Sequence, residues 1–320
     1  MAASVTHRIK EIKQPRGGYL SPKHFSETIF PPSAELIPLD GENISPALVG
    51  LAVDYLSRYV AGASIMDAFR ISLMGAKEVG EYDSASILAL SIEALVESPN
   101  RELDDYAIRA ACQLAGYDVA YRSGANAYRP IEDIHPNGTT IEHIREMVNR
   151  TMQFFDAYGP VVADGMTFTG GYTDTVPAGD ADFMTANTLW DMKVSKNKPT
   201  SAHTLQLLMY WRLAAHCRQE AYAGIAKIGI FNPRLGGVWT YAIEDIPEET
   251  VEAVDNDVIR YGVTVDDPLR IVAPAETVTS QSFDGTKPPA ANIPCKESAD
   301  THSTFLMRIK ALFARLLGKS

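Results

Sequence analysis

The segment GDADFMTANTLWDMKVSK, residues 179–196, places three aspartates and a lysine inside two stretches that otherwise have the composition of buried strands. Each stretch alternates apolar and polar residues, and the small pair Ala186-Asn187 separates them. Alternation with period two indicates a β-strand, and a short polar pair between two such runs indicates a tight turn. We therefore predict a β-hairpin that turns at Ala186-Asn187.

Pairing outward from this turn sets Asp182 opposite Asp191 and Asp180 opposite Lys193. Because successive side chains point to opposite faces of a strand, these four polar residues share one face. The aromatic residues between them, together with Met192, face the other way, into the core.

The predicted register creates a conflict between two carboxylates. Directly opposed residues have Cβ atoms about 4.5–5.5 Å apart, and like charges at that separation are destabilising. A hard divalent cation such as Mg²⁺ or Mn²⁺ resolves the conflict for Asp182 and Asp191, because it prefers oxygen ligands. The alternative is an ordinary ion pair on a solvent-facing sheet, between Lys193 and either Asp180 or Asp191.

Composition divides the 320-residue chain into five segments. They are an N-terminal arm with little regular structure (1–44), a helical region (45–158), a core that mixes strands and helices (159–262), a Pro-rich flexible linker (263–300) and a basic amphipathic helix (301–320). From Val161 the patterns predict the order strand, strand, strand, helix, strand, strand, helix. The expected fold class is thus α/β, with a central mixed sheet flanked by helices and a mainly helical N-terminal region.

The overall composition is that of a globular protein, with 46% hydrophobic and 22% charged residues. No apolar run approaches the roughly 18 residues of a transmembrane helix, and the N-terminus lacks the apolar core of a secretory signal. We therefore expect a cytoplasmic protein without a transmembrane segment. The three cysteines are far apart, so we expect neither a disulfide framework nor an iron–sulfur cluster.

The formal net charge of −11 by itself argues against nucleic-acid binding. The charge is uneven, however, because seven basic residues and one acidic residue lie between positions 193 and 234. This segment is either an electrostatic footprint for nucleic acid or one part of an unevenly charged surface.

A helix is expected after the hairpin, over SAHTLQLLMYWRLAAHC. Gln206 and Tyr210 are four residues apart and therefore share one face of this apolar helix. Together these residues resemble the motifs of RecB-type nucleases in the PD-(D/E)XK superfamily. The resemblance covers roughly residues 161–262 and comprises G-x-x-D (179–182), D-x-K (191–193) and Q-x-x-x-Y (206–210).

The resemblance implies a PD-(D/E)XK-like core and a Mg²⁺- or Mn²⁺-dependent DNA nuclease. By this analogy Asp182 and Asp191 hold the metal, assisted by the backbone carbonyl of Met192. The metal would lower the pKa of bound water and neutralise charge on the phosphate. Family habit favours an exonuclease, and recombination, repair, phage replication and defence all suit such an enzyme.

The remaining catalytic roles also follow from the resemblance. Lys193 would position the attacking water and balance phosphate charge, because a lysine acts as a base only when its pKa is depressed. Gln206 would orient Lys193 or the water. Tyr210 would support the site or contact the DNA backbone.

An upstream helix of this family supplies a further metal ligand, often a histidine four residues after a glycine. Asp54 occupies the matching position here, and Glu146 is a second candidate from a later helix. Lys196, Lys198 and Arg212 are the candidates for binding phosphates.

Two other readings of the sequence stay open. A nuclease-like fold without catalysis would make the chain a nucleic-acid-binding or scaffold protein, which suits the acidic net charge. The basic helix at 301–320 would dock on the body of the chain or on a protein partner.

Overall fold

The computed structural model describes residues 4–95 and 103–261, all within a compact unit that spans Met1–Asp266. The predicted linker and basic amphipathic helix lie outside the described residues. Within the described part of the chain, no helix is both long enough and apolar enough to cross a membrane.

Among the described residues, the segment 45–158 consists mainly of helices. Ser45 caps the first of its helices by accepting a hydrogen bond from the backbone of Leu48. Asn137 caps the last of them, because its side chain accepts a hydrogen bond from the backbone N–H of Thr140. The α-helices of the region are α2 (Pro46–Val60), α3 (Ile65–Ala68), α4 (Arg70–Glu78), α5 (Tyr82–Leu95), α6 (Asp105–Ala115), α7 (Asp118–Ser123) and α8 (Gly138–Tyr158).

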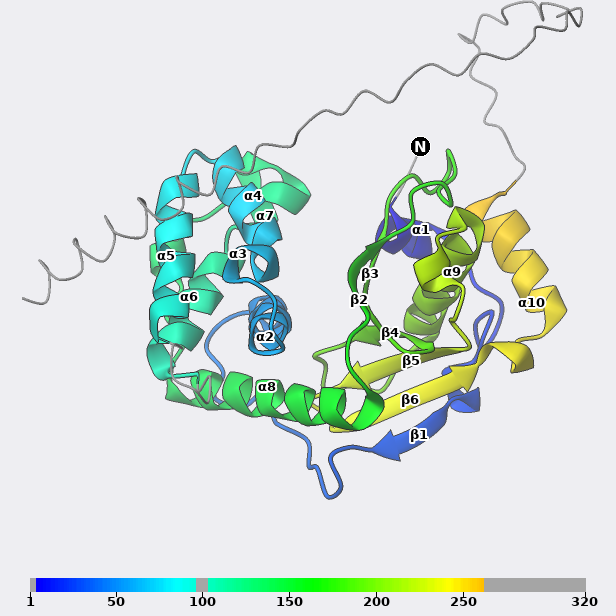
Figure 1. The fold of residues 1–320 in the computed structure, drawn as a ribbon, viewed down its shortest axis with the longest axis horizontal. Helices are drawn as coiled ribbons and strands as arrows, with labels where there is room; N and C mark the ends of the chain where they lie inside the picture. The colour runs from blue at the N-terminus through cyan, green and yellow to red at the C-terminus, as the bar shows by residue number, and fades with distance from the viewer. Residues whose placement is uncertain (1–3, 96–102, 262–320) are drawn as a thin grey trace, which may run out of the picture. The chain divides into compact units, whose positions relative to one another are not determined.

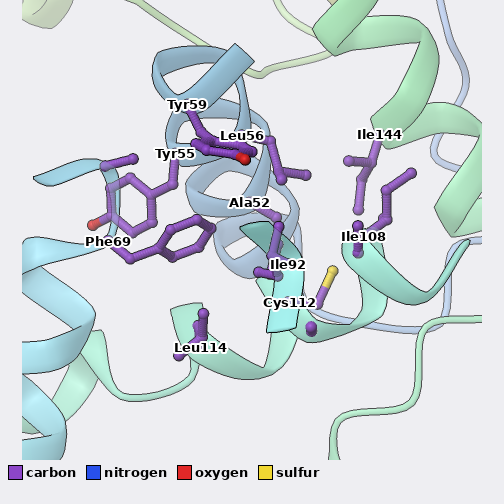
Figure 2. Packing of buried hydrophobic residues seen from close by; sticks show 14 of the residues in the cluster. Ala52, Tyr55, Leu56, Tyr59, Phe69, Ile92, Ile108, Cys112, Leu114 and Ile144 are labelled. Carbon is purple, nitrogen blue, oxygen red and sulfur yellow. The ribbon is translucent and has the colours of Figure 1, made fainter. Parts of the chain in front are cut away.

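These helices enclose a hydrophobic core of their own. The apolar face of α2 lies at its centre, where Leu56 is fully buried and Tyr55 stacks edge-on against Phe69. Figure 2 shows these side chains together with Ile108 and Cys112 from α6. Because α2 is fixed by this packing, the polar residues on its remaining face, including Asp54, are held in place.

A six-stranded mixed sheet forms the second part, in the order β1-β6-β5-β4-β3-β2 (Figure 1). Its β4–β5 pair is parallel and every other neighbouring pair is antiparallel. The order of elements predicted from Val161 onward is confirmed. The strands are β1 (Ser26–Ile29), β2 (Ala163–Thr167), β3 (Asp180–Thr185), β4 (Thr188–Met192), β5 (Lys227–Asn232) and β6 (Gly237–Ala242), with helices α9 (Ser201–Cys217) and α10 (Glu248–Ala253) and a π-helix (Val254–Ile259).

The N-terminal arm is more regular than predicted. It contributes helix α1 (Val5–Glu11) and the edge strand β1, which pairs with β6. Proline and glycine around these short elements conceal them in the sequence. The buried Arg234 side chain also holds the arm in place. It donates a hydrogen bond to the carbonyl of Pro38 and forms an ion pair with Glu42 at 2.8 Å.

The hairpin register is confirmed over its inner part, where Phe183 pairs with Trp190 and Thr185 with Thr188. It does not extend further as predicted. β4 pairs with β5 along its whole length, Thr188–Met192, and the backbone N–H of Lys193 donates to the carbonyl of Phe231 at 2.8 Å. The two strands of the hairpin therefore separate where their aspartates begin.

The two faces of the sheet pack against different helices. On one face, Met184, Leu189 and Ile230 pack with the buried side of α9. On the other face, Phe154 of α8 stacks on Phe231 and meets Trp190 edge-on. The side-chain alternation predicted for the hairpin is thus confirmed, since the aromatic and aspartate positions face opposite layers.

Candidate active site

A cavity of about 490 Å³ lies where the carboxyl end of β4 meets α2, α7 and α9. The charged and polar residues singled out in the hairpin and in α9 converge on it from separate parts of the chain. The residues proposed for catalysis or metal binding line this cavity with the exception of Glu146; they are Asp54, Asp182, Asp191, Met192, Lys193, Gln206 and Tyr210.

Asp191 is the most deeply placed carboxylate of the cavity, with 1% of its side chain exposed. Nζ of Lys193 lies 2.9 Å from its Oδ1, to which it donates, and 2.8 Å from its Oδ2. Oδ2 is buried and makes its contact with the ammonium group of Lys193. Asp191, not Asp180, is thus the ion-pair partner of Lys193.

The position of Asp182 is fixed by its own strand and by β4. Its Oδ2 accepts a hydrogen bond of 2.6 Å from the backbone N–H of Met192. Burial raises the pKa of Asp182 well above its usual range, and the nearby charges of Asp191 and Asp54 raise it further. Two carboxylates at the ends of separating strands therefore repel each other in a shared pocket.

The packing around Gly179 gives a physical reason for the glycine of the G-x-x-D motif. A Cβ at this position would lie 2.5 Å from Cγ2 of Val5, a contact that real side chains do not make. Val5 is fully buried, and its backbone N–H donates to the carbonyl of Ala178. The glycine thus lets α1 pack against the beginning of the strand that carries Asp182.

Asp180 was predicted to lie opposite Lys193, and the structure does not place it there. The residue begins β3 opposite Thr167 of β2, and its exposed side chain lines the cavity. Since the hairpin strands have already separated at this point, Asp180 does not face Lys193 across the ladder.

The two candidates for an upstream ligand are placed differently. Asp54 of α2 lines the cavity, and burial raises its pKa to about 6, with Arg58 acting in the opposite direction. Glu146 is half-exposed on α8, where it pairs with Arg150 at 2.9 Å, and it does not line the cavity. Of the two, only Asp54 is in reach of the hairpin carboxylates.

Gln206 and Tyr210 share the cavity-facing side of α9, as predicted. Nε2 of Gln206 donates to the phenol oxygen of Tyr210 over 2.8 Å. Burial raises the pKa of Tyr210 well above its usual value, and the charge of Asp191 raises it further, so the phenol stays neutral. The observed partner of Gln206 is therefore Tyr210, whereas the resemblance implied Lys193 or water.

The donor set suits a hard divalent cation, although it is not a complete cage. No group of three or more His, Cys, Asp or Glu side chains in the described ranges has the arrangement of a metal site. What the cavity does offer is two mutually repelling carboxylates, one of them almost fully buried, next to the backbone of Met192. Mg²⁺ commonly uses one or two carboxylates and keeps several waters, so these residues fit it.

The three basic residues proposed for phosphate binding lie elsewhere. Lys198 pairs with Glu27 of the edge strand at 2.7 Å, and Lys196 is an exposed loop residue. Arg212 donates two hydrogen bonds to Asp255, at 2.9 and 2.7 Å. The structure does not bring any of the three to the cavity.

Two other arginines do line the cavity, Arg58 of α2 and Arg122 of α7. Sequence reasoning missed both. Arg58 follows Asp54 by four residues, so the helical period alone places the two residues on the same face of α2. The sequence therefore contained a signal for Arg58. Arg122 gives no such signal, because α7 is a six-residue helix in the segment where the sequence patterns break down.

In comparisons with known proteins, no protein-family model, curated protein or solved structure matches this chain.

Proposed function

We propose that the chain is a metal-dependent nuclease that hydrolyses phosphodiester bonds of DNA, with an α/β core of the PD-(D/E)XK type. The observation that carries the proposal is the convergence of Asp182, Asp191 and Lys193 in one cavity. A buried carboxylate pair with a single lysine does not balance its own charge, so it has a physical reason to bind a cation.

The protein's own residues would divide the work as follows. Asp182, Asp191 and the Met192 carbonyl would hold Mg²⁺, which when bound supplies an activated water and neutralises phosphate charge. Burial lowers the pKa of Lys193, but the charges of Asp191 and Asp182 outweigh it and the net shift is upward. A lysine that stays charged is a poor base, so its role is to orient the water and stabilise charge on the phosphate oxygens.

Tyr210 and Gln206 supply neutral hydrogen-bond donors to the same cavity. The phenol does not ionise near neutral pH, so it can donate to a phosphate oxygen without adding negative charge. Its hydrogen bond with Gln206 fixes the direction of the hydroxyl group. We assign Tyr210 the contact with the substrate backbone and Gln206 the role of holding it.

The direct test is to incubate the purified protein with linear and covalently closed circular DNA in the presence of Mg²⁺, Mn²⁺ or EDTA. We expect cleavage with either metal and none with EDTA, and an exonuclease would degrade only the linear substrate. Cleavage that persists in EDTA would refute the metal mechanism. Absence of cleavage under every condition would instead support the non-catalytic binding or scaffold protein.

Proton and metal should compete for this cavity, which predicts a pH dependence. In the metal-free protein the pKa of Asp54, raised to about 6, exceeds that of the unfolded chain, so stability falls as pH rises from about 4 to 6. Asp182 shifts in the same direction. A bound divalent cation replaces the protons, so we expect Mg²⁺ to raise Tm little at pH 5 and by several degrees at pH 7.5. Differential scanning fluorimetry checks this, and an equal Mg²⁺ effect at both values would contradict it.

A further inference from the structure

Two guanidinium groups on the α2–α7 side of the cavity have no assigned role. Arg58 and Arg122 both line the cavity that contains Asp182 and Asp191. They lie 64 positions apart in the sequence numbering and on different helices, so local spacing does not explain why they meet here. Both are positioned by carboxylates that do not line the cavity.

Arg58 is held by β2. Its Nε and Nη2 contact Oδ2 of Asp164 at 2.9 and 2.8 Å, and 22% of its side chain remains exposed. The next residue on β2, Gly165, has a φ of 55°, and a Cβ there would lie 3.1 Å from Nη2 of Arg58. The strand thus both anchors the guanidinium and leaves room for it.

Arg122 is held more loosely, at the edge of a buried network. Its Nε lies 3.4 Å from Oδ2 of Asp118, a carboxylate that also accepts from Tyr55 at 2.5 Å and from Ser72 at 2.7 Å. Half of the Arg122 side chain is exposed. A guanidinium has five N–H donors, so most of those of Arg122 are available to a ligand in the cavity.

The charges around the cavity determine when an anion can bind there. Its lining carries four carboxylates against three basic groups, the latter being Arg58, Arg122 and Lys193. With the carboxylates ionised and no cation present, a phosphate would meet a net negative lining. A divalent cation at Asp182 and Asp191 reverses that sign, so anion binding at the arginines should require metal.

We propose that Arg58 and Arg122 form a subsite for a phosphate of the nucleic-acid strand, next to the phosphodiester that is cleaved. This inference rests on the proposed function and names the part of the substrate that the site grips. Guanidinium groups suit this task because their fork geometry matches phosphate oxygens. The phosphate comes either from a strand end or from the interior of a strand, and the chemistry of the two is shared.

The size of the cavity limits what enters it. A volume of about 490 Å³ falls in the range of pockets that enclose one small ligand. An intact duplex, whose major groove alone is about 12 Å wide, is far larger than such a pocket. The subsite should therefore take a short single-stranded segment.

The test measures binding separately from cleavage. A fluorescent single-stranded octanucleotide is titrated with protein in Ca²⁺, another hard oxygen-binding cation, and anisotropy gives Kd. Arg58→Gln and Arg122→Gln should each weaken binding about tenfold and reduce its salt dependence. Arg109→Gln is the matched control, because Arg109 is exposed on α6 and does not line the cavity. Binding by the control should equal that of the unmodified protein.

Further arms identify the source of the phosphate. Octanucleotides with a 5′-phosphate, a 3′-phosphate or neither, and a circular single strand, are compared with each variant. An effect of the arginine variants confined to one phosphorylated end assigns the subsite to a terminal phosphate. An equal effect on all four substrates assigns it to an internal phosphodiester.

Folding is checked alongside, because Arg122→Gln leaves Asp118 with one partner fewer. Thermal melts are recorded for each variant, and Arg122→Lys keeps the charge without the planar fork, so it should bind several-fold more weakly. Glutamine variants that fold and bind like Arg109→Gln would overturn the subsite, as would a lack of binding by the unmodified protein. Arginine-dependent binding without any cleavage would leave the subsite standing and remove the nuclease proposal.

Discussion

Asp182→Asn is expected to abolish DNA cleavage while raising the Tm of the metal-free protein. The substitution removes one of two repelling carboxylates in a buried pocket, where the charge of Asp191 raises the pKa of Asp182. Asparagine keeps the size of the side chain and an oxygen that can accept from the Met192 N–H. We expect the cleavage rate to fall by about 10³-fold or more and stability to rise by about 1 kcal/mol at pH 7.5.

The opposite signs of these two effects make the prediction specific. Asp174→Asn changes the same charge at an exposed position away from the cavity and should leave both rate and Tm unchanged. Mg²⁺ should raise the Tm of the unmodified protein and of Asp174→Asn, but not that of Asp182→Asn. A loss of stability in Asp182→Asn, with cleavage retained, would show that the carboxylate serves the fold and not a metal.

Lys193→Ala is expected to lower both cleavage and stability. Removing the ammonium group leaves Asp191, 1% exposed, without its ion-pair partner. Breaking a buried pair in this way typically costs about 3–5 kcal/mol. Loss of a charge that stabilises the transition state should slow cleavage by about 10³-fold, as measured in single-turnover assays with saturating protein.

Adding Mg²⁺ distinguishes the contribution of Lys193 to stability from its contribution to cleavage. Because Mg²⁺ would compensate Asp191 in place of the missing lysine, it should raise the Tm of Lys193→Ala by more than that of the unmodified protein. Cleavage should stay low even when Mg²⁺ restores stability. Lys196→Ala, at an exposed loop position, is the control for the lost charge. Normal cleavage by a folded Lys193→Ala would remove this residue from the mechanism.

The sequence predicted the hairpin and its faces because both follow from a local rule. Alternation with period two decides which side each residue faces, and the turn at Ala186-Asn187 sets the inner register. The end of the ladder is not local. β3 stops pairing with β4 at Phe183, while β4 pairs along its whole length with β5, which lies more than thirty residues away.

The rest of the site depends on tertiary packing. The helical periodicity of α2 was evident, but only the packed structure shows that the face bearing Asp54 and Arg58 turns toward the hairpin. The same packing commits Arg212 to Asp255, whereas its place in a basic segment had pointed to DNA. A count of charges along the chain does not reveal which of them already have partners in the fold.

The location of the metal is the central claim, and anomalous diffraction from crystals soaked in Mn²⁺ tests it most directly. We predict an anomalous peak in contact with the carboxylates of Asp182 and Asp191, and no such peak in crystals of Asp191→Asn. An unmodified protein that cleaves DNA but shows its Mn²⁺ peak away from these two carboxylates would contradict the account.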